Sequence, residues 1–399
     1  MKLSEIATKH GRNYAFGYLD RPFRLRITRS GCEFDDLVSP PTHLDPRDGW
    51  PIISDEEEKV LDERLKMWHT NAQVSGYGDV RDQVTRINSD IRQAREIPAS
   101  DFTVEPELLA RIVDLWDQHF FPKTAIRVQP YKIHVYGLGD HFRVHRDTPQ
   151  KDLIGTFLLG LGDTTFTGGL KVEGKECPAH VGSWCAFYPD MPHSVAEVDG
   201  HRASLAFQVF RAADTDTDVE TPTSVHVRGQ IAELVEHLEP PFGILLQHKY
   251  SFGTTSFSSF DALVTSSVHA LPHVQVRQFP VVIDAYSSRD YEDRDLRCRT
   301  AVYPFMGGHI DALLAYPDTK HQPKSHAECG EAWMDEVKNV PFFSLDFSQS
   351  LYTYKEQEQD EIEHTGNESR PWTEDSVYLS YALLALPKTS EGPAQVDEN

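Results

Sequence analysis

The chain is poor in basic residues and has no long apolar run. Its 39 Lys and Arg stand against 62 Asp and Glu, which gives a formal net charge of -23 over 399 residues. Because nucleic acids and anionic membranes bind basic surfaces, this deficit argues against either as a partner. No run approaches the ~18 apolar residues of a membrane-spanning helix, so no membrane span is predicted. A soluble protein is the simplest expectation, and a basic partner stays compatible with it.

Cysteine is also scarce. The five cysteines are an odd number and include no Cys-x-x-Cys pair. We therefore expect no disulfide framework and expect the protein to be in a reducing compartment. The first twenty residues lack the apolar segment of a secretory signal peptide. We expect a cytoplasmic or nuclear protein.

Helical signals dominate the first part of the chain after an irregular start. Residues 1–50, punctuated by Pro and Gly, are expected to be irregular. Ser54 and Glu57 form a capping-box signature, which predicts that a helix begins there. A second helix is expected from about Glu105, with Pro106 near its start.

From about Arg127 the chain changes character. Six short β-rich runs alternate with Gly-containing turns up to residue 211, a pattern typical of a sandwich or barrel rather than βαβ units. The polar segment 212–224 is expected to be a linker, with helices and strands mixed beyond it. We predict four parts: residues 1–50, irregular; 51–212, a strand-rich domain with N-terminal helices; 225–387, an accessory domain; and 388–399, a disordered tail.

His145 and Asp147 are candidate metal ligands, because residues i and i+2 of a strand face the same side. The His-x-Asp/Glu pattern alone has little specificity in a chain so rich in acidic residues. His193 could supply a third ligand from another strand. Two His and one carboxylate suit non-haem Fe(II), and zinc is the alternative. The pattern occurs five times, at His43/Asp45, His145/Asp147, His237/Glu239, His309/Asp311 and His326/Glu328.

The residues after His193 add a candidate anion site. The Asp-Gly pair at 199–200 is a strong signal for a two-residue hairpin turn, which would turn Arg202 and Ser204 toward the same cavity as His193. An Arg buried beside a metal needs an anion, and its planar guanidinium suits a carboxylate. The same register places Glu197 opposite Arg202, so an ordinary surface salt bridge is the alternative.

Together these motifs resemble the prolyl 4-hydroxylase-like branch of the 2-oxoglutarate/Fe(II) dioxygenases, and within it uncharacterised fungal proteins with that domain. The resemblance covers roughly residues 70–385 and is most specific in the middle third. Its motifs are Tyr136-Gly137 with Val144-His145-Arg146-Asp147, Gly168-Gly169, Pro192-His193-Ser194 and Arg202-Ala203-Ser204, together with the phrases HFRVHRDTPQ, IGTFLLGLGDTTFTGGLKV and DGHRASLAFQVF.

The resemblance implies an α+β fold: a double-stranded β-helix (jelly roll) core with flanking helices over 51–212, and a mixed α/β C-terminal region that could be a degenerate β-helix. Collagen-type prolyl hydroxylases have Lys where this chain has Arg202, which weakens the inference of a prolyl substrate. By matching position, the resemblance implies His145, Asp147 and His193 as iron ligands, Arg202 and Ser204 on the distal carboxylate of 2-oxoglutarate, and Tyr136 and Thr156 as further cosubstrate contacts.

The implied activity is hydroxylation of a C–H bond with Fe(II), 2-oxoglutarate and O2, releasing succinate and CO2. Ascorbate as an additional reductant is compatible with it. The substrate is a protein side chain of prolyl type or a small molecule, and the net charge disfavours nucleic acid. The alternative is a non-catalytic binding or scaffold protein with a vestigial dioxygenase fold.

A second set of candidate ligands lies in the C-terminal half. His309 and Asp311 are followed by His364 after 53 residues, a gap similar to the 46 residues between Asp147 and His193, and Arg370 lies just beyond. This set lacks an upstream tyrosine and the Arg-x-Ser that follows the distal histidine in the first. We therefore expect the C-terminal region to have a structural or partner-binding role.

Overall fold

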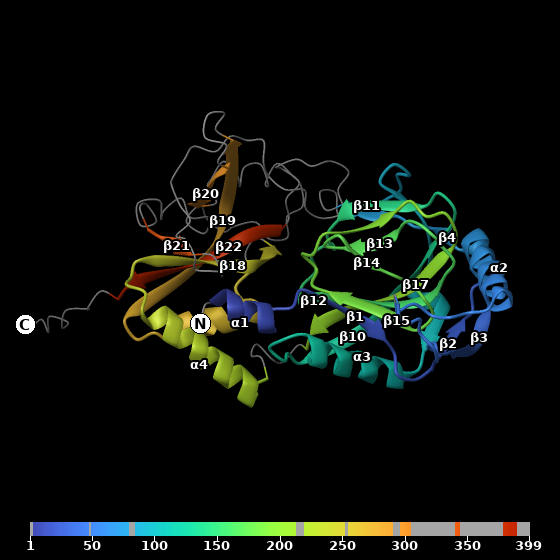
Figure 1. The fold of residues 1–399 in the computed structure, drawn as a ribbon, viewed down its shortest axis with the longest axis horizontal. Helices are drawn as coiled ribbons and strands as arrows, with labels where there is room; N and C mark the ends of the chain where they lie inside the picture. The colour runs from blue at the N-terminus through green and yellow to red at the C-terminus, as the bar shows by residue number, and fades with distance from the viewer. Residues whose placement is uncertain are drawn as a thin grey trace, which may run out of the picture.

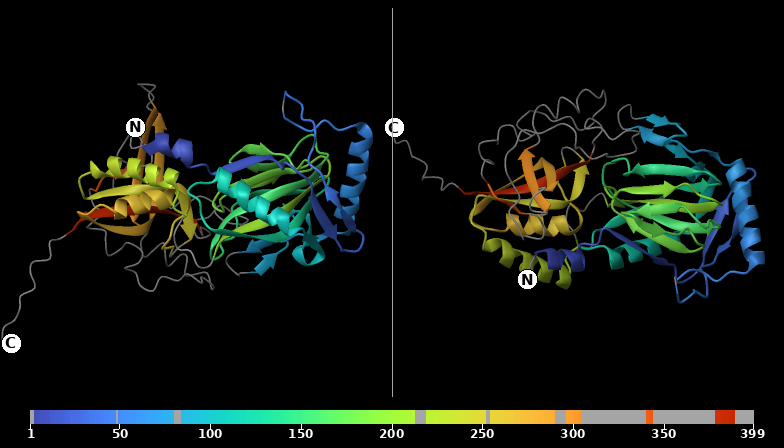
Figure 2. Two further views of the ribbon diagram at one scale, coloured as in Figure 1. Left: turned by 90° about the horizontal axis from the view of Figure 1, so that it is seen from below. Right: turned by 45° about the horizontal axis from the view of Figure 1, so that its top comes forward.

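The computed structural model describes residues 3–47, 49–79, 84–212, 219–251, 254–289, 296–304, 340–343 and 378–388. Within these residues the protein is α+β and rich in strands (Figures 1 and 2). None of the described helices is long and apolar enough to cross a membrane. The candidate ligands His309, Asp311 and His364, together with Arg370 and the tail 389–399, lie outside the described residues.

Two antiparallel sheets form the strand-rich half, drawn mainly in green in Figure 1. The first has the order β1 (Tyr14–Tyr18), β15 (Ser183–Phe187), β12 (Leu153–Asp163), β17 (Arg202–Arg211), β10 (Ile126–Tyr136), β8 (Arg95–Pro98), β4 (Gln73–Val74). The second has the order β14 (Lys175–Cys177), β13 (Gly169–Val172), β16 (His193–Ala196), β11 (His141–His145), β7 (Arg92–Gln93).

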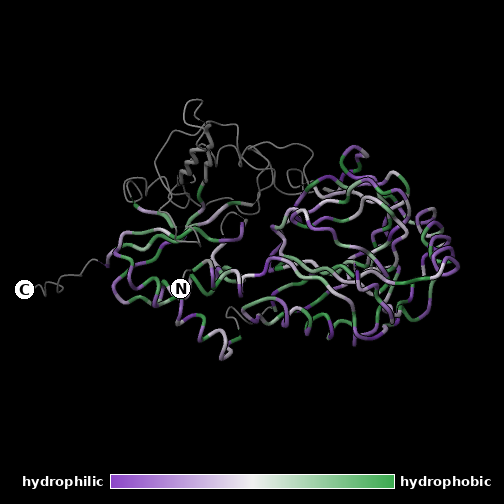
Figure 3. The backbone as a smooth tube through the Cα atoms, in the orientation of Figure 1, coloured by the Kyte–Doolittle hydropathy of each residue, from purple (hydrophilic) through white to green (hydrophobic). Residues whose placement is uncertain are grey.

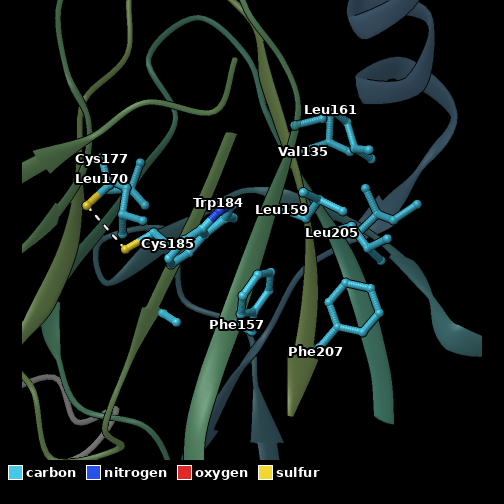
Figure 4. Close-up of a cluster of buried hydrophobic side chains, with 14 of the residues drawn as sticks. Val135, Phe157, Leu159, Leu161, Leu170, Cys177, Trp184, Cys185, Leu205 and Phe207 are labelled. Carbon is cyan, nitrogen blue, oxygen red and sulfur yellow. Dashed lines mark hydrogen bonds between the residues drawn. The ribbon is translucent and has the colours of Figure 1, made fainter. Parts of the chain in front are cut away.

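Alternation along the strands gives the seven-stranded sheet two different faces. On one face lie buried aromatic and aliphatic side chains such as Phe157 and Phe207, which Figure 4 shows together with side chains of the other face. The other face turns toward the five-stranded sheet. There the thiols of Cys177 and Cys185, one from each sheet, lie 3.3 Å apart, and both cysteines are free and buried.

Two helices cover the first of these faces and confirm the helix signals of the sequence. Helix α2 (Asp55–Asn71) begins with the predicted capping box of Ser54 and Glu57. Its side chains Leu65 and Trp68 enter the core, and many of the other residues of the helix are hydrophilic (Figure 3). Helix α3 (Pro106–His119) begins after Glu105 and buries Trp116; it crosses the outer side of the sheet in Figure 2.

The prediction that residues 1–50 are irregular is wrong. They contain one helix and three strands. Strand β1 pairs with β15, and β2 (Phe23–Ile27) pairs with β9 (Phe102–Val104), partners that lie far away in the sequence and leave no local pattern. Strand β2 also pairs locally with β3 (Phe34–Val38), a pair that was not predicted from the sequence. The elements outside the two large sheets are α1 (Leu3–His10), β2 (Phe23–Ile27), β3 (Phe34–Val38), β5 (Tyr77–Asp79), β6 (Val84–Arg86) and β9 (Phe102–Val104).

The C-terminal half has a separate apolar cluster around a third sheet, with its helices on one side of it (Figure 1). The sheet order is β20 (Leu296–Pro304), β19 (Val274–Arg289), β22 (Tyr378–Pro387), β18 (Phe242–Ser251), β21 (Phe342–Phe343). Helices α4 (Pro222–Glu236) and α5 (Ser259–His269) agree with the mixture of helices and strands expected beyond the linker. Because α4 begins at Pro222, the predicted linker is shorter than expected at its C-terminal end.

Gly155 in β12 tests the packing of α3 on the sheet. An added Cβ would collide with the Trp116 ring and lie 2.9 Å from the carbonyl oxygen of Phe187. We expect Gly155→Ala to lower the free energy of unfolding by about 1–3 kcal/mol, as overpacking does. The matched control is Gly229→Ala in helix α4, where nothing lies within 4 Å of the added Cβ; it should stabilise by about 0.5–1 kcal/mol. The free energy of unfolding is measured in urea, and a change in the same direction for both variants would contradict this packing.

Candidate functional site

His145 and His193 face each other from neighbouring strands. They are register partners at the end of β11 and the start of β16, with ring centroids 4.1 Å apart. The Nδ1 atom of His145 lies 2.8 Å from the carbonyl oxygen of Arg143, and that of His193 lies 2.9 Å from the carbonyl oxygen of Met191. A carbonyl can only accept, so each Nδ1 carries the hydrogen and each Nε2 keeps a lone pair.

Burial favours the form of these rings that can bind a metal. Burial, and to a lesser extent the neighbouring His193, hold the pKa of His145 well below its usual value. His145 is therefore neutral near pH 7, as a metal ligand must be. Phe142 stacks on His145 at 3.6 Å between centroids, and Phe187 contacts the His193 ring at 4.7 Å.

Asp147 completes a two-histidine, one-carboxylate set, but not by the geometry expected. Strand β11 ends at His145, so Asp147 lies beyond it and strand alternation does not orient its side chain. Instead its backbone N–H donates to the carbonyl oxygen of Pro189 at 3.0 Å, and its Oδ1 lies 3.8 Å from Nε2 of His193. Its side chain keeps 24% of its exposure, so a ligand can reach it.

The residues fit a metal in chemical type, while the described part of the chain holds no ready-made cluster of three metal-binding side chains. Two imidazole Nε2 atoms and one carboxylate match the donor set of non-haem Fe(II) sites, with Zn²⁺ as the other metal such donors bind. One Asp147 oxygen, Oδ2, is already engaged, because the hydroxyl of Thr156 donates to it at 2.6 Å.

The predicted hairpin at 199–200 is wrong. Strand β16 pairs with β11 and β13, whereas β17 pairs with β10 and β12, so this segment carries the chain from one sheet to the other. The carboxylate of Asp199 accepts hydrogen bonds from the backbone N–H groups of Phe166 and Thr167, which fixes a wider connection. Glu197 is exposed and Arg202 buried, so the surface salt bridge between them is also wrong.

The side chain of Arg202 nevertheless lies between the two sheets, because it contacts Cys177 of the smaller sheet and the buried Asp163. One nitrogen, Nη2, donates to the carbonyl oxygen of Cys177 at 3.2 Å, and Nη1 lies 3.7 Å from the buried carboxylate of Asp163. Gly169 leaves room for this guanidinium, since an added Cβ would collide with Nη1, and its φ of +97° suits glycine. A buried acidic neighbour of Arg202 was not expected from the sequence.

The other predicted cosubstrate contacts fall on the same face of the seven-stranded sheet. Tyr136 is the cross-strand partner of Arg202. Ser204 lies two residues further along β17, so its side chain is on the same face as that of Arg202. Thr156 faces this side too, because its hydroxyl meets Asp147. The structure therefore brings the predicted residues to one face, while the described contact of Thr156 is with a candidate ligand.

Two further residues at the site were missed. His134 is the cross-strand partner of Ser204, and its Nδ1 accepts a hydrogen bond from the buried Arg92 at 2.8 Å. The Arg92 guanidinium lies 4.4 Å from the centroid of the Phe142 ring, which itself stacks on His145. Burial, and then Arg92, keep the pKa of His134 well below its usual value. The sequence signal for His134 was its place two residues before Tyr136, a predicted contact, which puts both side chains on the same face of the strand.

Comparisons with known proteins give likenesses in structure only. No protein-family profile matches the chain, and no curated protein sequence matches it. A Pseudomonas putida prolyl-4-hydroxylase structure is 14% identical over 53% of this chain and 97% of its own, with a TM-score of 0.30. The viral collagen prolyl hydroxylase of Paramecium Bursaria Chlorella virus-1, in complex with 2-oxoglutarate, is 11% identical over 51% and 98%, with a TM-score of 0.29.

A Burkholderia pseudomallei oxidoreductase of the 2-oxoglutarate/Fe(II) oxygenase family is 18% identical over 33% of this chain and 75% of its own, with a TM-score of 0.25. At TM-scores this low, the functional argument rests on the residues of this chain alone.

The hydroxyl of Thr156 tests whether Asp147 is a metal ligand. Groups that hydrogen-bond to a metal ligand typically contribute 10–100-fold to metal affinity. We expect Thr156→Val, which keeps the shape and removes the donor, to weaken Co²⁺ binding by roughly that factor. Thr156→Ser keeps the hydroxyl and serves as the control. Equal affinities in a Co²⁺ titration of Thr156→Val and the wild type would mean that Asp147 does not bind the metal.

Proposed function

We propose that this protein is an Fe(II)- and 2-oxoglutarate-dependent oxygenase whose iron ligands are His145, Asp147 and His193. The observation that carries the proposal is the pairing of the two histidines across adjacent strands. Both have Nδ1 bound to a backbone carbonyl, and the carboxylate of Asp147 lies 3.8 Å from Nε2 of His193. Three neutral or anionic donors that leave open positions suit oxygen chemistry at Fe(II).

A double-stranded β-helix is the fold we propose for this half. The proposal is supported by two antiparallel sheets that share a buried side. Strands β11 and β16, which carry His145 and His193, belong to the smaller sheet, and β17, which carries Arg202, belongs to the larger. The ligands and the anion-binding residues then lie on opposite sheets that face one inner space.

Arg202 is the residue we propose for the distal carboxylate of 2-oxoglutarate. A guanidinium has five N–H donors in a planar fork, more than its described hydrogen bond to Cys177 uses. The 3.7 Å separation from Asp163 is longer than a hydrogen bond, so this carboxylate neutralises the charge without taking up the fork. Ser204 and Tyr136, on the same strand face, would add hydroxyl groups beside it.

When bound, Fe(II) supplies the redox chemistry that couples the oxidative decarboxylation of 2-oxoglutarate to hydroxylation of a C–H bond. The chain's own tasks are to keep the His145 imidazole neutral, to orient both imidazoles through two carbonyls and to hold the cosubstrate by Arg202. The target we propose is a protein side chain of prolyl type or a small molecule, because a net charge of -23 opposes nucleic acid.

One observation favours a second function, that of a non-catalytic binding or scaffold protein. Arg202 and Asp163 are both buried and already neutralise each other, as in a site that has lost its anion. In that case the face would keep its shape without turnover.

Anaerobic addition of Fe(II) and then 2-oxoglutarate separates the two functions. We expect a visible metal-to-cosubstrate charge-transfer band in the wild type and none in His145→Ala, which loses one of the three metal donors. Arg202→Met should keep the Fe(II) site and weaken 2-oxoglutarate binding by roughly 10-fold or more, since a charge-assisted pair contributes about 1.5–3 kcal/mol. Oxygen should then release succinate from the wild type and not from His145→Ala.

A matched control is His201→Ala, because His201 precedes Arg202 but binds Asp62 on helix α2 rather than the site. It should keep the band. If the wild type gives no band, or if His145→Ala gives the same one, the oxygenase proposal is wrong. A band without succinate release for any peptide or metabolite tried would favour the scaffold.

A further inference from the structure

We propose that Asp190 is a positioning residue for the metal ligands and that strand β18 of the C-terminal half holds it in place. This inference rests on the proposed function, because it takes His145, Asp147 and His193 as the ligands. Asp190 itself does not contact the inner face of the site; it acts through the backbone on both sides of it.

The segment 189–191 supports the ligands through three consecutive carbonyl oxygens. That of Pro189 accepts the backbone N–H of Asp147 at 3.0 Å, and that of Met191 accepts the His193 ring N–H at 2.9 Å. Between them, the carbonyl oxygen of Asp190 accepts Nε of Arg146, the residue that separates His145 from Asp147. A displacement of this short segment would therefore move two ligands together.

The side chain of Asp190 ties the segment to β18. Its buried carboxylate lies 3.1 Å from Nδ1 of His248 and accepts the backbone N–H of Lys249 at 2.9 Å. Burial alone would lower the pKa of His248, but Asp190 and then Asp261 outweigh it and raise that pKa above its usual value. A larger fraction of His248 is thus protonated near neutral pH, which strengthens its bond to the carboxylate.

Asp190 also lies between positive charges from both halves. Arg146 belongs to the strand-rich half and Lys249 to β18, and burial together with the nearby Arg146 lowers the pKa of Lys249 to about 8. Asp190 opposes that shift, so its negative charge lies close to Lys249. Removing the carboxylate would take this acceptor away from the His248 ring and from the backbone N–H of Lys249.

Strand β18 is itself firmly held, which makes it a suitable anchor. It pairs with β22 and β21. The carboxylate of Asp261 on helix α5 accepts the backbone N–H groups of Gln247 and His248. Asp261 also accepts the hydroxyl of Tyr250. Asp261 therefore grips the same strand as Asp190 but makes no described hydrogen bond to segment 189–191, and this difference supplies a matched control.

The experiment measures Co²⁺ affinity of the full-length chain by visible absorption, with Co²⁺ as an oxygen-stable substitute for Fe(II). We expect Asp190→Asn to weaken Co²⁺ binding roughly 10–100-fold, the usual effect of losing a group that orients ligands. His248→Phe keeps a ring against Tyr188 and removes the donor, and should weaken it about 10-fold. The double variant should be no weaker than Asp190→Asn alone, because the two residues act as one unit.

Asp261→Asn is the control for a general loss of stability. It should lower the unfolding temperature and leave Co²⁺ affinity within about twofold of the wild type. A purely structural role for Asp190 would instead lower the affinity of Asp190→Asn and Asp261→Asn equally at an equal loss of stability, and would leave the cobalt spectrum unchanged in shape.

The outcomes distinguish the two proposals. If the wild type shows no Co²⁺ spectrum that depends on His145, the metal site and the positioning role both fall. If it does, and Asp190→Asn binds as tightly as Asp261→Asn, only the positioning role falls. Should Asp190→Asn fail to give a native circular dichroism spectrum, His248→Phe decides: unchanged affinity in that folded variant overturns the role of β18.

Discussion

Two backbone carbonyls, from Arg143 and Met191, set the chemistry of the candidate site. Each binds Nδ1 of one histidine and so selects the tautomer whose Nε2 has a lone pair for a metal. The distance between His145 and His193 is set by the pairing of β11 with β16, since the two residues are register partners. The rigidity of the sheet thus passes directly to the ligand pair. Two aromatic contacts, from Phe142 and Phe187, further limit how the rings can turn.

The charges near the two histidines explain why Arg202 is the strongest candidate for binding an anion and why its own charge is already balanced by a neighbouring carboxylate. A guanidinium buried without an anion would be very costly, so an unliganded protein needs a counter-ion. Asp163 supplies it at 3.7 Å, and is itself held by the backbone N–H of Ala179. An entering dicarboxylate would bring a second negative charge to the same arginine. The affinity of Arg202 for the dicarboxylate therefore depends on how much more strongly it binds that ligand than it interacts with Asp163.

The sequence was most informative where structure is local. The capping box at Ser54 and the helix beginning after Glu105 were predicted correctly, because both signals lie within one turn of the element they start. The prediction failed where distant pairing decides. Strand β1 pairs with the distant β15, and the Asp-Gly segment at 199–200 changes sheets instead of closing a hairpin. Asp147 lies 3.8 Å from His193 but past the end of its strand, so the alternation argument was wrong for it.

That last error has a physical consequence for the whole molecule. His145 ends β11 and His193 begins β16, so the ligands lie where the sheet stops supplying hydrogen bonds. Strand ends are the parts of a sheet that open most readily, whereas a metal site requires its ligands to be fixed closely. Support must therefore come from outside the two sheets. Segment 189–191 supplies it for Asp147 and His193, and the only carboxylate in that segment is bound by β18. In this arrangement the C-terminal half contributes to the precision of the site without adding a residue to it.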